Sequence, residues 1–138
     1  MKKEKIFLDT DVILDLLTKR EPHFEPAVEL FLLIQERSVS AYTSPVIIAN
    51  TFYILNRHLD KKKAVQSLIK LRSLVKVLNC GDRIIDLALS SDFTDFEDSI
   101  QYYTALENNI DTLITRNVKD YKTANITILT PLEYIKSR

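Results

Sequence analysis

Acidic and polar side chains gather at three separate places in the sequence, where they could hold a divalent cation. Asp9 follows the apolar run KIFL, and Asp98 lies in the stretch DFTDFEDSIQYY, residues 92–103. The third place is LITRNVKDY, which supplies Thr115, Asn117 and Asp120. Unpaired carboxylates that converge repel one another and favour a hard cation such as Mg²⁺ or Mn²⁺. We therefore predict a metal site to which these three segments contribute.

Asp98 is the acid that its own helix explains least. The pattern TDFE predicts a capping box in which Thr94 and Glu97 bond to free backbone amides, with Asp95 as a first-turn acid favoured by the helix dipole. Asp98 lies about 100° further round the helix, on the same face as Tyr102. No basic residue lies within one helical turn of Asp98. An inward-facing carboxylate at this position needs a partner from another part of the chain.

The other acids have structural explanations beside the functional one. Asp9 could cap the helix that follows it, and Asp11 is a first-turn acid that we interpret as mainly structural. Asn117 and Asp120 are ordinary residues for a polar turn. The functional interpretation depends on the arrangement of the elements, because ligands bind outside the carboxyl ends of the strands in a parallel sheet.

The elements that must position these residues alternate between short apolar strands and amphipathic helices. Strands are predicted at residues 4–8, 40–42, 75–79, 111–115 and 125–129. Helices are predicted at residues 12–17, 24–37, 45–59, 61–74, 82–91, 95–107 and 131–138, with start signals at Ser44, Asp60 and Thr130. Strands separated by helices imply parallel pairing with right-handed crossovers. We predict one domain over residues 1–138, a three-layer α/β/α fold with a central, mainly parallel sheet.

Composition and charge limit the binding modes and the cellular location that fit this sequence. Of its 138 residues, 46% are hydrophobic and 28% are charged, and 19 basic residues balance 19 acidic ones. This balance argues against a protein that binds nucleic acid by overall charge alone, and the basic stretch 60–76 is interpreted as a solvated helix face. Asp9, Asp11 and Asp15 interrupt the apolar run that an export signal needs, and no apolar run is long enough to span a membrane. Cys80 is the single cysteine and so has no partner for an internal disulfide. We expect a cytoplasmic protein without a membrane segment.

The sequence resembles the PIN-domain family of metal-dependent nucleases, and in particular the VapC-like toxins of bacterial toxin–antitoxin pairs. Four segments carry the resemblance, in the order and at about the spacing of the family: IFLDTDVILDLL, SPVIIANTFYIL, DFEDSIQYYTAL and LITRNVKDY. The final segment NITILTPLEYI is similar to the usual C-terminal segment of family members. The resemblance covers nearly the whole chain and implies the same α/β fold.

The resemblance also implies which residues form the site. Members of the family usually present four acidic positions that hold one or two divalent ions. Asp9 matches the first position and Asp98 the third. Asn50 stands at the second position, where a glutamate is usual, and Asn117 stands at the fourth, with Asp120 as the nearest acid able to substitute. Asparagine can still ligate a cation through its carbonyl oxygen, but it contributes no charge.

The implied activity is hydrolysis of RNA phosphodiester bonds with Mg²⁺ or Mn²⁺ bound by Asp9, Asp98 and Asp120. Thr115 could bond to a metal ligand or to a phosphate. Arg116, Lys119 and Lys122 are candidates for phosphate contact because they follow the site in sequence. The resemblance further implies a small antitoxin protein as a partner and a homodimer.

Two other interpretations remain open on the residues alone. The segment DTDVI is similar to the nucleophile motif of haloacid-dehalogenase-like phosphatases, but the following GDRIID element comes before the LIT strand that should precede it. A PIN-fold module that binds RNA or protein and has little or no catalytic activity is the other alternative. Asn50 and Asn117 favour such a module, whereas Asp9, Asp98 and Asp120 favour the nuclease.

Overall fold

A five-stranded parallel sheet forms the centre of the computed structural model, which describes residues 3–121 and 124–138. Its strands are β1 (Glu4–Leu8), β2 (Val39–Thr43), β3 (Val75–Val77), β4 (Thr112–Ile114) and β5 (Thr127–Leu129). Their order across the sheet is β3-β2-β1-β4-β5, and every neighbouring pair is parallel. The predicted α/β fold with a central parallel sheet is confirmed.

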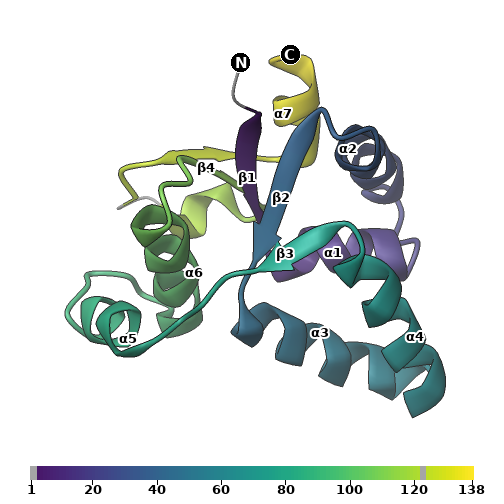
Figure 1. The fold of residues 1–138 in the computed structure, drawn as a ribbon, viewed down its shortest axis with the longest axis horizontal. Coiled ribbons are helices and arrows are strands. Elements are labelled where there is room, and N and C mark those ends of the chain that lie inside the picture. The colour runs from purple at the N-terminus through teal and green to yellow at the C-terminus, as the bar shows by residue number, and fades with distance from the viewer. Residues whose placement is uncertain (1–2, 122–123) are drawn as a thin grey trace.

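Helices cover the two faces of the sheet. They are α1 (Thr10–Leu17), α2 (Phe24–Gln35), α3 (Pro45–His58), α4 (Lys61–Arg72), α5 (Asp82–Leu89), α6 (Phe96–Glu107) and α7 (Pro131–Lys136), with a short 3₁₀ helix at Val118–Tyr121. Figure 1 shows α5 and α6 on one side of β1 and β2, and α1, α2 and α4 on the other. In the described part of the chain, the helices fall short of the length and apolar character that a membrane crossing requires.

The helix starts follow the capping signals in three places and depart from them in one. The side chains of Ser44 and Asp60 each accept a bond from a backbone N–H in the first turn, and the capping box at Thr130 is complete. The capping box predicted at Thr94 is wrong, because Asp95 is the cap of α6 and accepts a bond from the backbone N–H of Asp98.

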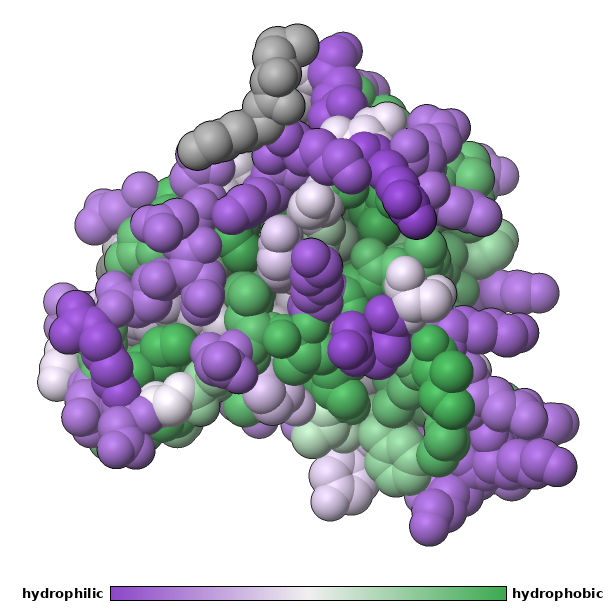
Figure 2. Space-filling model, viewed as in Figure 1, coloured by the Kyte–Doolittle hydropathy of each residue, from purple (hydrophilic) through white to green (hydrophobic). Residues whose placement is uncertain are grey.

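The core packs along β1, whose last three side chains, Ile6, Phe7 and Leu8, are fully buried. Burial on both faces is typical of a central parallel strand, which reads as a continuous apolar run. On α6 the side chains of Ile100 and Ala105 are buried, but Leu106 is 37% exposed. The basic stretch at the start of α4 is exposed as predicted, and Figure 2 shows hydrophilic side chains projecting where α3 and α4 meet.

The strand order determines where on the sheet a ligand would bind. The chain runs from β1 outward to β2 and β3, and then returns to the other side of β1 as β4. The crossovers therefore diverge between β1 and β4, the position where open α/β sheets bind ligands. The backbone N–H of Asp9 donates to the carbonyl of Ile114 at 3.0 Å, so the ends of these two strands are tied together.

Candidate functional site

Asp9 lies at the carboxyl end of β1 and is both a helix cap and the centre of a carboxylate cluster. The backbone N–H of Thr10 donates to its Oδ1 at 2.8 Å, which fixes the carboxylate at the start of α1. The hydroxyl groups of Thr115 and Tyr121 each lie 3.0 Å from its Oδ2. With only 9% of its surface exposed, Asp9 is held from three sides. The structural and the functional interpretations of this residue are therefore compatible.

Asp11 joins the same cluster, although the sequence analysis placed it outside the site. Its Oδ2 accepts bonds from the backbone N–H of Arg116 at 3.0 Å and from the side-chain amide of Asn117 at 3.2 Å. The Thr115 hydroxyl lies 3.3 Å from the same oxygen. Its other oxygen, Oδ1, is buried and has no hydrogen-bond partner among the described residues. A buried carboxylate oxygen without a partner is costly unless a further group occupies the space beside it.

Asp98 approaches the cluster from α6, as its unexplained position in the sequence predicted. The Tyr121 hydroxyl lies 3.3 Å from its Oδ1, so one phenol stands between the carboxylates of Asp9 and Asp98. Since a hydroxyl carries a single proton, Tyr121 can donate to only one of them at a time. This shared contact brings β1, α6 and the segment after β4 together.

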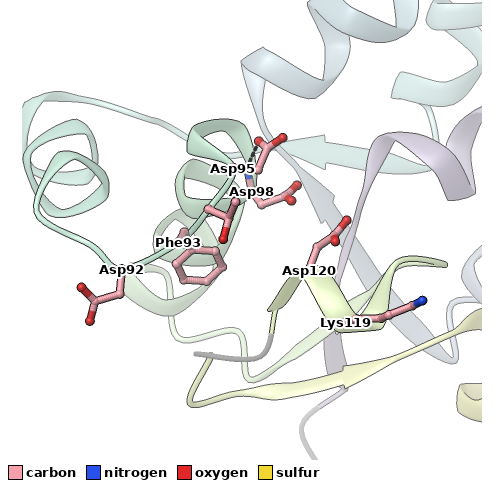
Figure 3. Close-up of a pocket in the computed structure, with 7 residues that line it drawn as sticks. Asp92, Phe93, Asp95, Asp98, Lys119 and Asp120 are labelled. Carbon is pink, nitrogen blue, oxygen red and sulfur yellow. Dashed lines mark hydrogen bonds between the residues drawn. The ribbon is translucent and has the colours of Figure 1, made fainter.

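A cavity of about 550 Å³ opens beside Asp98, between the start of α6 and the 3₁₀ helix. We call it the α6 cavity. Figure 3 shows the carboxylates of Asp98 and Asp120 facing each other across it, whereas the carboxylate of Asp92 points away. Lys119 lines the cavity too, but its amine points away from the two acids. Asp120 is thus placed near the cluster, on the side of Asp98.

A second cavity, of about 530 Å³, lies between α1, α3 and α6, and we call it the α3 cavity. Asn50 and Glu97 line it, and the Asn50 amide donates to Glu97 Oε2 at 3.0 Å. Glu97 was not among the residues predicted for the site, because the TDFE pattern assigned its side chain to a capping box. The signal that could have identified Glu97 was its position next to Asp98 in the sequence. The acidic and amide side chains that share this cavity are Asp9, Asp11, Asn50, Glu97, Asp98 and Asn117.

Burial and mutual repulsion make these acids hard to ionise together. Burial raises the pKa of Asp9, and burial with the charge of Asp9 raises the pKa of Asp11 to about 6. Burial and the charges of Asp9, Asp95 and Asp120 raise the pKa of Asp98 to about 7. Burial and the neighbouring carboxylates also raise the pKa of Tyr121, which keeps its hydroxyl protonated. A positive charge placed among these groups would be strongly favoured.

Of the cations predicted for phosphate contact, one is paired with a buried acid and another points away from the cluster. The Arg116 guanidinium turns to Asp15, with Nε 2.6 Å from Oδ2 and Nη2 3.3 Å from Oδ1. Because Asp15 is only 1% exposed, this pair neutralises a buried charge, and the predicted role of Arg116 is wrong in geometry. Lys119 points away as described above. Lys122 lies outside the described residues.

The carboxylate oxygens of the site suit a hard divalent cation that takes its remaining ligands from water and from a substrate phosphate. Within residues 3–121 and 124–138, no three acidic, histidine or cysteine side chains are already placed to ligate one ion. Mg²⁺, however, usually keeps several waters and takes one or two carboxylates together with substrate phosphate oxygens. Asp9, Asp11 and Asp98 supply carboxylates of this kind, and the unpartnered Oδ1 of Asp11 is the atom that most needs a cation.

The fold and the site together define a parallel α/β protein with a carboxylate cluster at the point where its crossovers diverge. The family model described as PIN domain matches residues 5–119, and the chain belongs to this family. The resemblance inferred from the sequence is thereby confirmed.

Individual relatives agree with this membership. The chain is 27% identical over 139 residues to Ribonuclease VapC1 of Aquifex aeolicus (strain VF5), covering 97% of this chain and 95% of that protein. It has the fold of VapBC2 from Rickettsia felis, solved bound to a promoter DNA fragment (17% identity, 91% and 96% of the two chains, TM-score 0.70). A toxin–antitoxin complex from Klebsiella pneumoniae shares that fold (19% identity, 91% and 97%, TM-score 0.69).

Proposed function

We propose that this chain is a divalent-metal-dependent ribonuclease that hydrolyses RNA phosphodiester bonds, as the toxin of a toxin–antitoxin pair. The observation that carries the proposal is the cluster of Asp9, Asp11 and Asp98, in which a buried Asp11 oxygen has no hydrogen-bond partner among residues 3–121 and 124–138. Membership of the PIN domain family and the similarity to a protein named a ribonuclease support the same activity.

Within this proposal each described residue has a defined task. Asp9 and Asp98 hold Mg²⁺ or Mn²⁺, with Asp11 beside them and Asp120 across the α6 cavity. The bound ion supplies positive charge for the scissile phosphate and lowers the pKa of a water molecule. Thr115 fixes the carboxylates of Asp9 and Asp11 through its hydroxyl.

The two asparagines act as donors in this proposal. The Asn50 amide orients Glu97, so the carboxylate missing at position 50 is supplied from α6. The Asn117 amide stabilises the charge of Asp11. Tyr121 positions Asp9 against Asp98, because its hydroxyl contacts both carboxylates.

The test is cleavage of a mixed RNA pool by the purified protein with Mg²⁺ or Mn²⁺. EDTA and Asp98→Ala should both abolish cleavage, because each removes part of the metal site. Asp92→Ala is the matched control, since this acid lines the α6 cavity but its carboxylate points away from Asp98 and Asp120, and the variant should cleave normally. A folded protein that cleaves with neither metal would refute the proposed activity.

A binding module that does not cleave RNA is the second candidate. It is favoured by Asn50 and Asn117 at usually acidic positions, and by the lack of three converging ligands among the described residues. Such a module would retain RNA affinity in the Asp98→Ala variant and would show no cleavage in the parent protein. Measuring both properties on the same two proteins separates the candidates.

The proposal includes partners and a cellular setting. A small antitoxin that covers the α3 cavity would protect cellular RNA, and the toxin–antitoxin complex from Klebsiella pneumoniae supports this part of the proposal. A homodimer and a cytoplasmic location complete it, the latter because RNA and a reducing environment suit a chain with the single cysteine Cys80. Co-purification with a co-expressed candidate antitoxin, followed by loss of RNA cleavage, tests the partner.

A further inference from the structure

One face of α3 directs a row of side chains into the α3 cavity. Asn50, Tyr53, Ile54 and Arg57 line it at spacings of three, four and seven residues, which is the pattern of a single helix face. Asn50 ends the row beside the carboxylates, where it contacts Glu97. Since a helix rises about 1.5 Å per residue, Arg57 lies about 10 Å further along the axis. Figure 1 shows α3 between α6 and α4.

Tyr53 presents an aromatic ring to solvent within this cavity. It is 66% exposed, and the ring of Phe52 supports it in an edge-to-face contact with centroids 6.2 Å apart. In the part of the chain that the structure describes, its hydroxyl makes no side-chain hydrogen bond. An exposed ring one turn from a carboxylate cluster is a surface on which a nucleobase can stack.

Arginine side chains lie at the outer part of the same cavity. Arg57 is exposed and forms no ion pair with the described residues. Arg20 has 46% of its side chain exposed and lies 3.9 Å from Asp15, a long contact that leaves its other nitrogens open. Along α3 the lining of the cavity therefore runs from Asn50 beside the acids, past the Tyr53 ring, to the Arg57 guanidinium. This order suits a nucleic-acid strand, in which a sugar that carries one base lies between successive phosphates.

We propose that Tyr53 and Arg57 form a subsite for single-stranded RNA, in which a base adjacent to the scissile phosphate stacks on Tyr53 and a neighbouring phosphate contacts Arg57. The inference rests on the proposed function, because the carboxylate cluster defines where the scissile phosphate lies. An unpaired strand is required since the bases of a duplex are already stacked and cannot lie flat on the ring. Charge complementarity at Arg57 and Arg20 favours RNA over a protein segment as the occupant.

The test is the affinity of the full chain for a short fluorescent single-stranded RNA, with a duplex of the same sequence in parallel. Tyr53→Ala should weaken binding by about 5- to 100-fold, as expected for the loss of one base stack. Tyr53→Phe should bind within about two-fold of the parent, because stacking needs only the ring. Ile69→Ala is the matched control, since Ile69 is 64% exposed on the neighbouring helix α4.

Arg57→Gln should weaken binding of every sequence and reduce the slope of log Kd against log salt by about 1. Lys70→Gln, which removes an exposed cation of α4, should leave that slope unchanged. Affinity of Tyr53→Ala equal to that of Ile69→Ala would overturn the subsite, as would duplex binding as tight as that of the single strand.

Failure of the subsite and failure of the nuclease give different results. A parent that cleaves RNA but does not depend on Tyr53 refutes the subsite alone. A parent that binds single-stranded RNA through Tyr53 without cleaving it refutes the nuclease alone. A parent with no RNA affinity overturns both, and loss of antitoxin binding on Tyr53→Ala would then identify a protein as the occupant.

Discussion

The carboxylate cluster should make the metal-free protein less stable at about pH 8 than at about pH 5. The pKa of Asp11 is raised from 3.8 to about 6, and that of Asp98 from 3.8 to about 7, both first by burial. A raised pKa means that the folded state binds more protons than the unfolded state between these values. The resulting stability is fully present below pH 3.8 and is lost as the pH rises through about 6 to 7.

The magnitude follows from the two shifts. Between about pH 5 and pH 8, linkage gives about 1 kcal/mol for Asp11. Asp98 would give about 3 kcal/mol without correction, but its carboxylate is half-buried, and solvent screening reduces this to about 1 kcal/mol. The free energy of unfolding should therefore fall by about 2 kcal/mol over this range. Replacing Asp98 by Asn removes one of the two groups and should remove about half of the fall.

Urea unfolding in EDTA at the two pH values measures this difference for the parent, Asp98→Asn and the control Asp92→Asn. Subtracting the pH dependence of the unfolding free energy of Asp98→Asn from that of the parent cancels the contributions of the titratable groups that both proteins share. Mg²⁺ or Mn²⁺ at about 100 times Kd should add about 2.7 kcal/mol at pH 8 and much less at pH 5, where protons compete for the carboxylates. A parent whose stability stays level or rises with pH in EDTA would show that the cluster is not strained by its own charge.

Three further predictions concern single contacts. Arg116→Ala should lower the free energy of unfolding by about 3 kcal/mol, because it leaves the buried Asp15 with only the 3.9 Å contact to Arg20; a stable variant with weakened RNA binding would restore the phosphate role. Asp60→Ala should cost about 1 kcal/mol of stability through the lost cap of α4 and leave cleavage unchanged, as thermal melts and RNA assays would show. Glu97→Gln should reduce metal affinity measured by calorimetry by about ten-fold, and Asn50→Ala by less, because Asn50 only orients the Glu97 carboxylate. Equal metal affinity in the parent and Glu97→Gln would exclude Glu97 from the site.

Local signals in the sequence predicted the elements well because each depends on a few neighbouring residues. The caps at Ser44 and Asp60 bond to backbone amides three residues away, so the pattern contains both partners. The error at Thr94 has the same origin. Two adjacent residues could both cap α6. Asp95 is the cap, and the Glu97 carboxylate instead accepts a hydrogen bond from the Asn50 amide, 47 residues away.

The site was predicted only where a residue lacked a local explanation. Asp98 was identified because its own helix offered it no partner, and the structure supplies Tyr121. Asp11 was missed because a first-turn acid has an adequate local explanation, while its contacts come from residues 104 to 106 positions later. Arg116 was placed wrongly for the same reason, since its partner Asp15 is 101 positions away. Pairings over such distances depend on strand order, which periodicity does not encode.

The two hydroxyl contacts to Asp9 have a consequence for the protein during its own synthesis. Thr115 and Tyr121 lie 106 and 112 residues after Asp9, and β4 must insert beside β1 before either hydroxyl can reach that carboxylate. A nascent chain that still holds its last strands in the ribosome tunnel has the carboxylates but cannot assemble them. The ribonuclease proposed for this chain would thus remain harmless to the translating ribosome and its message until β4 and the segment that carries Tyr121 have left the tunnel.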